Sequence, residues 1–128
     1  MAIHQEIIFT SEPKQLFEVL TQAEHFSKMS EAAAEIVAQP GGQFSLFDGM
    51  ISGQTVEIVP STRLVQEWRA QNWPAEVYSN IKFELEALDN GHTKLTFEQT
   101  GHPAEQEQHL EQGWSMKYWT PIQSYLDR

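Results

Sequence analysis

The chain contains no cysteine among its 128 residues. This absence excludes a disulfide framework, a thiolate nucleophile and a zinc site with sulfur ligands. Basic residues are also few, because 8 Lys and Arg stand against 18 Asp and Glu, for a formal net charge of −10. Nucleic acids and anionic membrane surfaces attract basic proteins, so we expect neither of them among the partners.

Long apolar runs are missing as well. No stretch approaches the roughly 20 residues that span a bilayer. The first residues, MAIHQEIIF, do not place a basic segment before an apolar one, as a signal peptide does. We therefore expect a cytoplasmic protein, and the length predicts a single domain over residues 1–128.

Signatures of catalysis are equally scarce. The glycines between residues 41 and 53 lack the spacing of a phosphate-binding loop. Glu24-His25 is not followed by a second histidine at metalloprotease spacing, and the spacing of His102 and His109 matches no recognised metal site. We expect no catalytic residue, no metal and no cofactor.

The strongest positive signal is the C-terminal stretch from Ala104 to Leu126. It follows Pro103 and begins with polar and acidic residues, as a helix N-terminus does. Apolar and aromatic residues then recur at steps of three or four: Leu110, Trp114, Tyr118, Ile122 and Tyr125. A helix of roughly 34 Å with this stripe must cover a large apolar surface. The stripe fits a core helix and also a helix that closes a cavity. Pro121 predicts a kink one turn upstream.

The N-terminal part predicts one strand and two short helices. Ala2 to Thr10 is rich in Ile and Phe and is predicted to form the strand. Ser11 is predicted to cap a helix that has Pro13 near its start. Thr21 and Glu24 have the capping-box spacing, which predicts the second helix.

After residue 34 the pattern changes to short strands, predicted at 35–38, 44–47, 50–59 and 63–70. Gly53 inside one of them predicts a bulge or a bend. Strands and helices do not alternate after residue 30, which excludes a doubly wound parallel sheet. The prediction is an α+β domain in which the long helix covers one face of a curved antiparallel sheet of six or seven strands.

The hairpin from Val77 to Gly101 has the clearest register. A two-residue Asn-Gly turn would place the two apolar faces out of step. A three-residue loop, Asp89-Asn90-Gly91, with Gly91 in the left-handed conformation aligns them. The pairs predicted by the three-residue loop are Leu85 with Leu95, Phe83 with Phe97, Lys82 with Glu98 and Glu86 with Lys94.

Two sets of residues are candidates for a site. The first would face the space between sheet and helix: Leu64, Gln66, Trp68, Ile81, Phe83, Leu95, Phe97, Gln99, Leu110, Trp114, Tyr118 and Ile122. If these side chains only line that space, it can hold a small hydrophobic ligand; if they fill it, there is no cavity. An inward glutamine needs a partner, which is a side chain, a water or a ligand.

The second set comprises Arg69, Trp73 and Pro74 in the loop that follows the predicted strand 63–70. Because loops lie on the surface, this aromatic loop is a candidate for contact with another protein. The alternative is that Trp73 packs down over the edge of the sheet.

Five stretches resemble a known family in their order and content: GGQFSLFDGMISG (41–53), VPSTRLVQEWR (59–69), NWPAEVYS (72–79), TKLTFEQTGHP (93–103) and GWSMKYWTPIQSYL (113–126). Together they resemble the C-terminal domain of the heat-shock-protein-90 ATPase activator and its stand-alone homologues. The resemblance is close over residues 30–126 and looser before them. It implies the helix-grip fold of the START and birch-pollen-allergen superfamily, in which a curved sheet grips a long C-terminal helix around a cavity.

The resemblance also implies a function. It predicts a non-catalytic protein-interaction module that contacts a heat-shock-protein-90-type chaperone. The complete activator has an additional N-terminal domain that stimulates the chaperone's ATPase, for which 128 residues leave no room, so little stimulation is expected from this chain alone. The alternative is a binder of a small hydrophobic ligand, because many superfamily members bind one and a few are cyclases or hydrolases.

Overall fold

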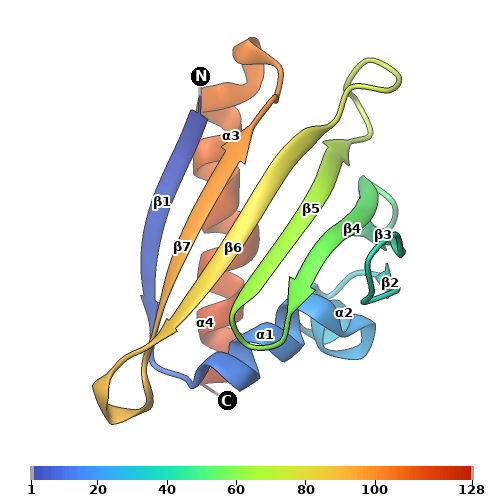
Figure 1. Cartoon of the computed structure of the whole chain (residues 1–128). Coiled ribbons are helices and arrows are strands. Elements are labelled where there is room, and N and C mark those ends of the chain that lie inside the picture. Colours follow the sequence, from blue (N-terminus) through green and yellow to red (C-terminus); the bar gives the residue numbers. More distant parts are fainter. Residues whose placement is uncertain (1, 128) are drawn as a thin grey trace.

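The computed structural model describes residues 2–127, in which seven strands form one antiparallel sheet. The strands are β1 (Ala2–Phe9), β2 (Glu35–Ile36), β3 (Gln43–Leu46), β4 (Ile51–Val59), β5 (Arg63–Ala70), β6 (Ser79–Ala87) and β7 (Thr93–Thr100). Their order across the sheet is β1-β7-β6-β5-β4-β3-β2, so the first strand pairs with the last. Figure 1 shows a curved sheet with the C-terminal helix lying across its far face. The predicted α+β architecture is confirmed.

Two short helices follow β1, namely α1 (Pro13–Thr21) and α2 (Ala23–Ser30). Both contact the last helical segment, α4 (Thr120–Leu126), so they close one end of the layer between sheet and helix. Their inward side chains are buried: Leu16, Phe17, Leu20, Phe26 and Met29.

The start of α1 differs from the expectation. The residue that caps it is Glu12 and not Ser11, although Pro13 does occupy the first turn. Ser11 is buried, and its carbonyl oxygen accepts a hydrogen bond of 2.6 Å from the Thr93 hydroxyl. Ser11 therefore connects the end of β1 to β7 through a tertiary hydrogen bond, which a local sequence pattern does not predict.

The start of α2 also differs. The predicted capping box of Thr21 and Glu24 is wrong, because Gln22 is the residue that precedes the first turn. The Thr21 hydroxyl donates to the carbonyl of Phe17 at 2.7 Å and is thus used inside α1. A hydroxyl four residues after a helical carbonyl has this bond within reach, and it competes with capping.

The hairpin has the predicted three-residue connection. Leu85 pairs with Leu95, and Phe83 pairs with Phe97. Asn90 and Gly91 both have positive φ angles, of 66° and 74°. The register therefore places both apolar faces on the same side of the sheet, as the alternation in sequence requires.

The C-terminal helix runs from Ala104 to Leu126 and changes its winding in the middle. A 3-10 turn (Ala104–Gln106) leads into α3 (Glu107–Trp114), a π turn (Ser115–Trp119) follows, and α4 completes the helix. The Thr120 N–H donates to the Ser115 carbonyl, a longer step than in an α-helix. The irregularity lies one turn upstream of Pro121, where the sequence predicted a kink. No helix in the part of the chain that the structure describes is long and apolar enough to cross a membrane.

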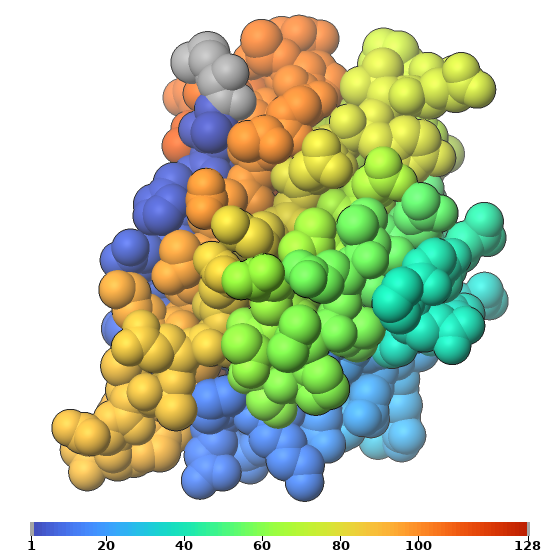
Figure 2. All heavy atoms as spheres, viewed as in Figure 1, coloured from blue at the N-terminus to red at the C-terminus, as the bar shows by residue number. Residues whose placement is uncertain are grey.

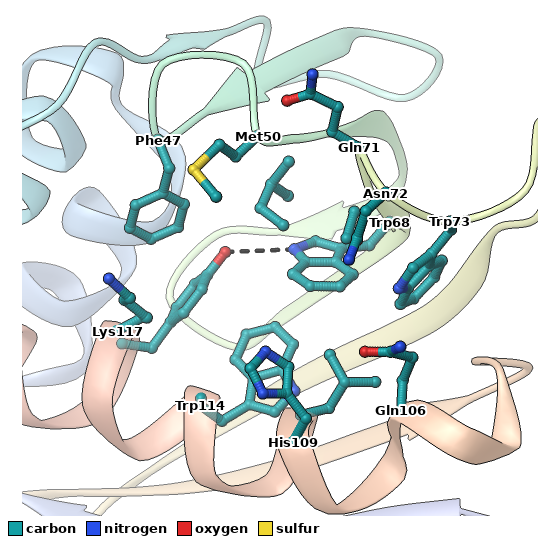
Figure 3. A pocket seen from close by; sticks show the side chains of 15 residues that line it. Phe47, Met50, Trp68, Gln71, Asn72, Trp73, Gln106, His109, Trp114 and Lys117 are labelled. Carbon is teal, nitrogen blue, oxygen red and sulfur yellow. Dashed lines mark hydrogen bonds between the residues drawn. The ribbon is translucent and has the colours of Figure 1, made fainter.

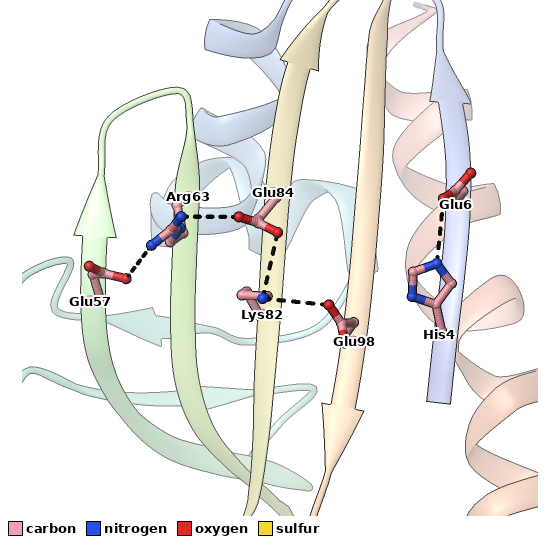
Figure 4. A network of polar contacts seen from close by, with 7 residues as sticks. All are labelled: His4, Glu6, Glu57, Arg63, Lys82, Glu84 and Glu98. Atoms are coloured by element: carbon pink, nitrogen blue, oxygen red, sulfur yellow. Dashed lines mark hydrogen bonds and ion pairs between the residues drawn. The ribbon is translucent and has the colours of Figure 1, made fainter. Parts of the chain in front are cut away.

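The outer face of the sheet carries a chain of ion pairs across neighbouring strands (Figure 4). Arg63 lies 3.3 Å from a Glu57 oxygen and 3.2 Å from a Glu84 oxygen. Lys82 bridges Glu84 at 3.6 Å and Glu98 at 3.5 Å, and the contact with Glu98 is the one expected from the hairpin register. Figure 2 views this face, on which the strands hide most of the C-terminal helix. The buried apolar core lies on the other side of the sheet, against the C-terminal helix (Figure 1).

Gly53 occupies a regular position opposite Trp68 in the ladder between β4 and β5. The bulge in β4 lies further along, between Thr55 and Glu57, so of the two alternatives predicted at Gly53 the bulge is wrong. Gly53 is needed for a different reason, because a Cβ atom there would collide with the carbonyl oxygen of Glu67 and with the Phe44 ring. The glycine allows β4 to approach β5 closely.

We expect Gly53→Ala to lower the free energy of unfolding by about 2 kcal/mol, since an added methyl group in a tightly packed position forces the backbone to shift. Urea denaturation followed by circular dichroism measures this change. Ser52→Ala, one residue earlier in the same strand, is the control and should stay within about 0.5 kcal/mol of the parent. Equal stability of the two variants would contradict the close approach.

Candidate functional site

A pocket of about 490 Å³ lies between the C-terminal helix and the end of the sheet at which β4 begins and β5 ends (Figure 3). Three segments form it: the connection from β3 to β4, the end of β5 with the loop after it, and the helix from residue 106 to residue 118. Its lining residues are Phe47, Met50, Ile51, Trp68, Ala70, Gln71, Asn72, Trp73, Gln106, His109, Leu110, Gly113, Trp114, Lys117 and Tyr118. This volume is in the range of small-molecule sites.

Aromatic rings form the inner wall of the pocket. The ring of Trp68 lies 5.1 Å from that of Trp114 and 5.7 Å from that of Trp73, measured between centroids. The Trp114 and Tyr118 rings are 4.4 Å apart. These spacings and the tilted or edge-to-face orientations are those that aromatic pairs prefer. Polar residues lie at the exposed rim: Gln71, Asn72, His109 and Lys117.

The orientation of Trp114 is set by a buried chain of hydrogen bonds. Its indole N–H donates to the side-chain oxygen of Gln99 at 2.8 Å. The Gln99 amide nitrogen donates to the Ser79 hydroxyl at 3.0 Å, and this hydroxyl donates to the Trp68 carbonyl at 2.8 Å. Side chains therefore satisfy the inward glutamine at position 99, one of the partners considered from the sequence.

Tyr118 adds a polar atom to the aromatic wall. Its hydroxyl oxygen accepts a hydrogen bond of 3.4 Å from the Trp68 indole N–H, drawn as the dashed line in Figure 3. Burial raises the pKa of this hydroxyl well above its usual value, while the bond from Trp68 acts in the opposite direction. The hydroxyl is therefore neutral at physiological pH and keeps its proton.

Of the twelve predicted cavity residues, four line this pocket: Trp68, Leu110, Trp114 and Tyr118. The other eight are buried elsewhere between sheet and helix: Leu64, Gln66, Ile81, Phe83, Leu95, Phe97, Gln99 and Ile122. Phe97, for example, lies 4.2 Å from the Trp114 ring, and Phe83 lies 5.3 Å from Phe97. Large side chains fill the centre of the layer, and the open space is at one end.

The loop residues Arg69, Trp73 and Pro74 have different placements. Trp73 packs inward, with an exposed fraction of 5%, which is the alternative to an exposed anchor. The Arg69 guanidinium donates to the carbonyls of Trp73 at 2.8 Å and Pro74 at 3.2 Å, and it lies over the Tyr78 ring. Pro74 is exposed. Arg69 thus orders the loop from the outer face, and Trp73 anchors it from the inner face.

The sequence-based selection missed part of the pocket. The missed residues lie in the connections after β3 and β5, at the adjoining ends of β4 and β5, and on the helix: Phe47, Met50, Ile51, Ala70, Gln71, Asn72, Gln106, His109, Gly113 and Lys117. Gly113 was the one feature of the sequence that could have pointed to this part of the pocket, because a glycine inside a helix is unfavourable and usually has a structural or functional reason. A Cβ atom at Gly113 would meet nothing within 4 Å, so close packing does not explain this glycine.

The histidines that bracket the helix start do not form a metal site. His102 Nε2 lies 2.8 Å from a Glu107 oxygen, whereas His109 lies at the pocket rim. Residues 2–127 contain no cluster of three or more His, Asp or Glu side chains that could hold a metal ion.

A curved antiparallel sheet around a long C-terminal helix, with two short helices after the first strand and a pocket between the layers, defines a helix-grip domain. The chain belongs to the family described as "Activator of Hsp90 ATPase homolog 1-like protein", whose model matches residues 10–127. The resemblance identified in the sequence is therefore confirmed.

Two curated relatives are similar over most of the chain. The "Activator of 90 kDa heat shock protein ATPase homolog 2" of Mus musculus is 31% identical over 127 residues, which cover 99% of this chain and 38% of the relative. The corresponding homolog 1 of Homo sapiens is 35% identical over 115 residues, which cover 89% of this chain and 33% of the relative. The chain thus spans about a third of the length of these relatives.

A solved structure is similar over its whole length. The protein described as an HSP90 activator from Plasmodium falciparum superposes with a TM-score of 0.94 at 27% identity, covering 99% of this chain and 96% of that one. The sheet, the short helices and the long helix are therefore common to both.

We expect Trp73→Ala to lower the free energy of unfolding by about 3 kcal/mol, because it removes a buried ring packed on Trp68 and leaves a cavity. Thermal and urea denaturation measure the loss. Asn72→Ala, an exposed neighbour, serves as the control. Unchanged stability of the Trp73 variant would show that the indole is not packed as described.

Gly113→Ala should act in the opposite direction. The added methyl group meets open space, and alanine favours the helix over glycine, so we expect stability to rise by up to about 1 kcal/mol. The same denaturation measurement decides the sign. A loss of stability would mean that the helix packs more tightly around Gly113 than the structure indicates.

Proposed function

We propose that this chain is a non-catalytic binding domain for an Hsp90-type chaperone. The observation that carries the proposal is membership of the activator family together with relatives that are named for that chaperone's ATPase. The similarity extends to a solved structure of nearly the same length that is described as an HSP90 activator. We interpret a chain that matches such a structure over nearly its whole length as a domain that binds the chaperone.

The proposal is limited to binding, because the chain spans only about a third of the curated relatives. Both curated relatives are named for activation of that ATPase, and the chain matches only part of each. We therefore propose weak binding, with a dissociation constant in the micromolar range or above, and little stimulation by this chain alone. We also propose a cytoplasmic location and no role for nucleic acid or membranes, in keeping with the net charge of −10.

The loop after β5 is the proposed contact surface. Arg69 fixes the loop through hydrogen bonds to its carbonyls, and the buried Trp73 holds it against the sheet. This leaves Pro74 exposed and Tyr78 with an exposed fraction of 47% beside the guanidinium. A loop that is already ordered loses little conformational freedom on binding, and exposed aromatic residues dominate many protein contacts.

The test is a titration of the full chain against a purified Hsp90-type chaperone by isothermal calorimetry, with the chaperone's ATPase rate measured in parallel. We expect Tyr78→Ala to weaken binding by about 2 kcal/mol, or roughly 30-fold, because it removes an exposed aromatic anchor. Ile8→Ala is the matched control, since Ile8 is 53% exposed on the edge strand β1 and lies outside the loop after β5.

Three outcomes would contradict the proposal. Absence of binding at several hundred micromolar chaperone would remove the chaperone contact altogether. Equal effects of Tyr78→Ala and Ile8→Ala would remove the loop after β5 as the contact surface. Strong ATPase stimulation by this chain would overturn the limit to binding alone.

A further inference from the structure

Gly113 keeps the pocket open where any other residue would narrow it. It lies between Leu110 and Trp114 in the helix and lines the pocket, and space is free at the position of its Cβ. Glycine destabilises a helix interior, and here neither a close backbone approach nor a positive φ angle requires it. A glycine that leaves space in a pocket wall, although another residue would make the helix more stable, is typical of a site that accommodates a ligand.

The Tyr118 hydroxyl offers the pocket a hydrogen-bond donor. The side chain is 3% exposed, and its oxygen accepts from Trp68. No acceptor for its own proton exists among the hydrogen bonds of residues 2–127. A buried donor without an acceptor is unfavourable, so a ligand oxygen that accepts a hydrogen bond from this hydroxyl would be stabilised.

Lys117 offers the pocket a positive charge. It lines the rim next to Tyr118 in sequence, at the end of the pocket opposite Trp73 (Figure 3). Within the described part of the chain it forms no ion pair, whereas Lys28, Arg63, Lys82 and Lys94 each pair with a carboxylate. In a protein with a net charge of −10, an uncompensated lysine at the mouth of an apolar pocket selects for an anionic ligand.

We propose that this pocket binds a small aromatic carboxylate. The ring system of the ligand lies against the indoles of Trp68, Trp73 and Trp114, which form the inner wall. One carboxylate oxygen accepts a hydrogen bond from the Tyr118 hydroxyl, and the Lys117 ammonium balances the charge at the rim. The volume of about 490 Å³ holds two or three fused rings with such a group. This site is on the inner side of the sheet and is separate from the proposed chaperone contact at Tyr78.

The test uses 2-naphthoate and its neutral analogue 2-naphthamide, titrated into the full chain by isothermal calorimetry. We expect 2-naphthoate to bind three- to fivefold more tightly than the amide, the preference that one exposed charge pair supplies. Lys117→Gln should abolish this preference and leave the affinity for the amide unchanged. Lys14→Gln is the matched control, because Lys14 is an exposed lysine on α1 that does not line the pocket.

Two variants test the location of the site. Gly113→Leu fills the open wall and should weaken both compounds at least tenfold. Gly113→Ala, which retains helix stability, should weaken them less. Circular dichroism confirms that each variant is folded. The expected order of affinities is parent, then Gly113→Ala, then Gly113→Leu.

Three results would overturn the proposal. The first is no heat and no rise in melting temperature with either compound at millimolar concentration. The second is a preference for the carboxylate that survives Lys117→Gln, and the third is unchanged affinity in folded Gly113→Leu. The second result would mean that Lys117 does not supply the preference for the carboxylate, and the third that the compounds bind elsewhere on the surface.

Discussion

The hydrogen bond from the Trp114 indole to the buried Gln99 is the contact on which the rest of the structure depends. Trp114 is 2% exposed, and its ring lies 4.2 Å from that of Phe97 and 5.1 Å from that of Trp68. A ring packed on three sides could still rotate or slide along the sheet. The directional bond to Gln99, itself held by Ser79, removes this freedom because a buried polar group must keep its partner. The helix is thereby registered on the sheet, and the pocket forms on the side of Trp114 that the core leaves open.

Much of the fold could be predicted from the sequence because its signals are local. The hairpin register follows from strict alternation and from Gly91, and the extent of the long helix follows from its apolar stripe. The helix caps were predicted less well, because the Thr21 hydroxyl donates to an intrahelical carbonyl and the Ser11 carbonyl accepts a tertiary hydrogen bond from the Thr93 hydroxyl. The first partner is a local competitor for the cap, whereas the second lies 82 residues away in the sequence and is absent from any local pattern.

The site was predicted only in part, for a related reason. Alternation identifies which side chains point inward, but filling or lining a space depends on their summed volume in three dimensions. Trp68 and Trp114 line the pocket while Phe83 and Phe97, with the same inward pattern, pack in the core. Trp73 shows the converse case, since a loop position suggested exposure and its ring became part of the wall. Its carbonyl is bonded to Arg69 on the outer face, so the pocket and the proposed contact surface share one loop.

The π turn at Ser115–Trp119 divides the C-terminal helix into two segments of different rotational phase. In a continuous α-helix each residue advances the facing direction by about 100°, so neighbours in sequence point to different surroundings. The wider turn takes up part of that rotation, and Tyr118 and Trp119 are consequently both buried. The segment before the turn faces the pocket, and the segment after it faces α1 and α2. The turn thus accommodates the difference in rotational phase between the two helical segments. The residues of the pocket wall and those of the closed end of the core can therefore vary independently, because a small rotation of one segment need not rotate the other.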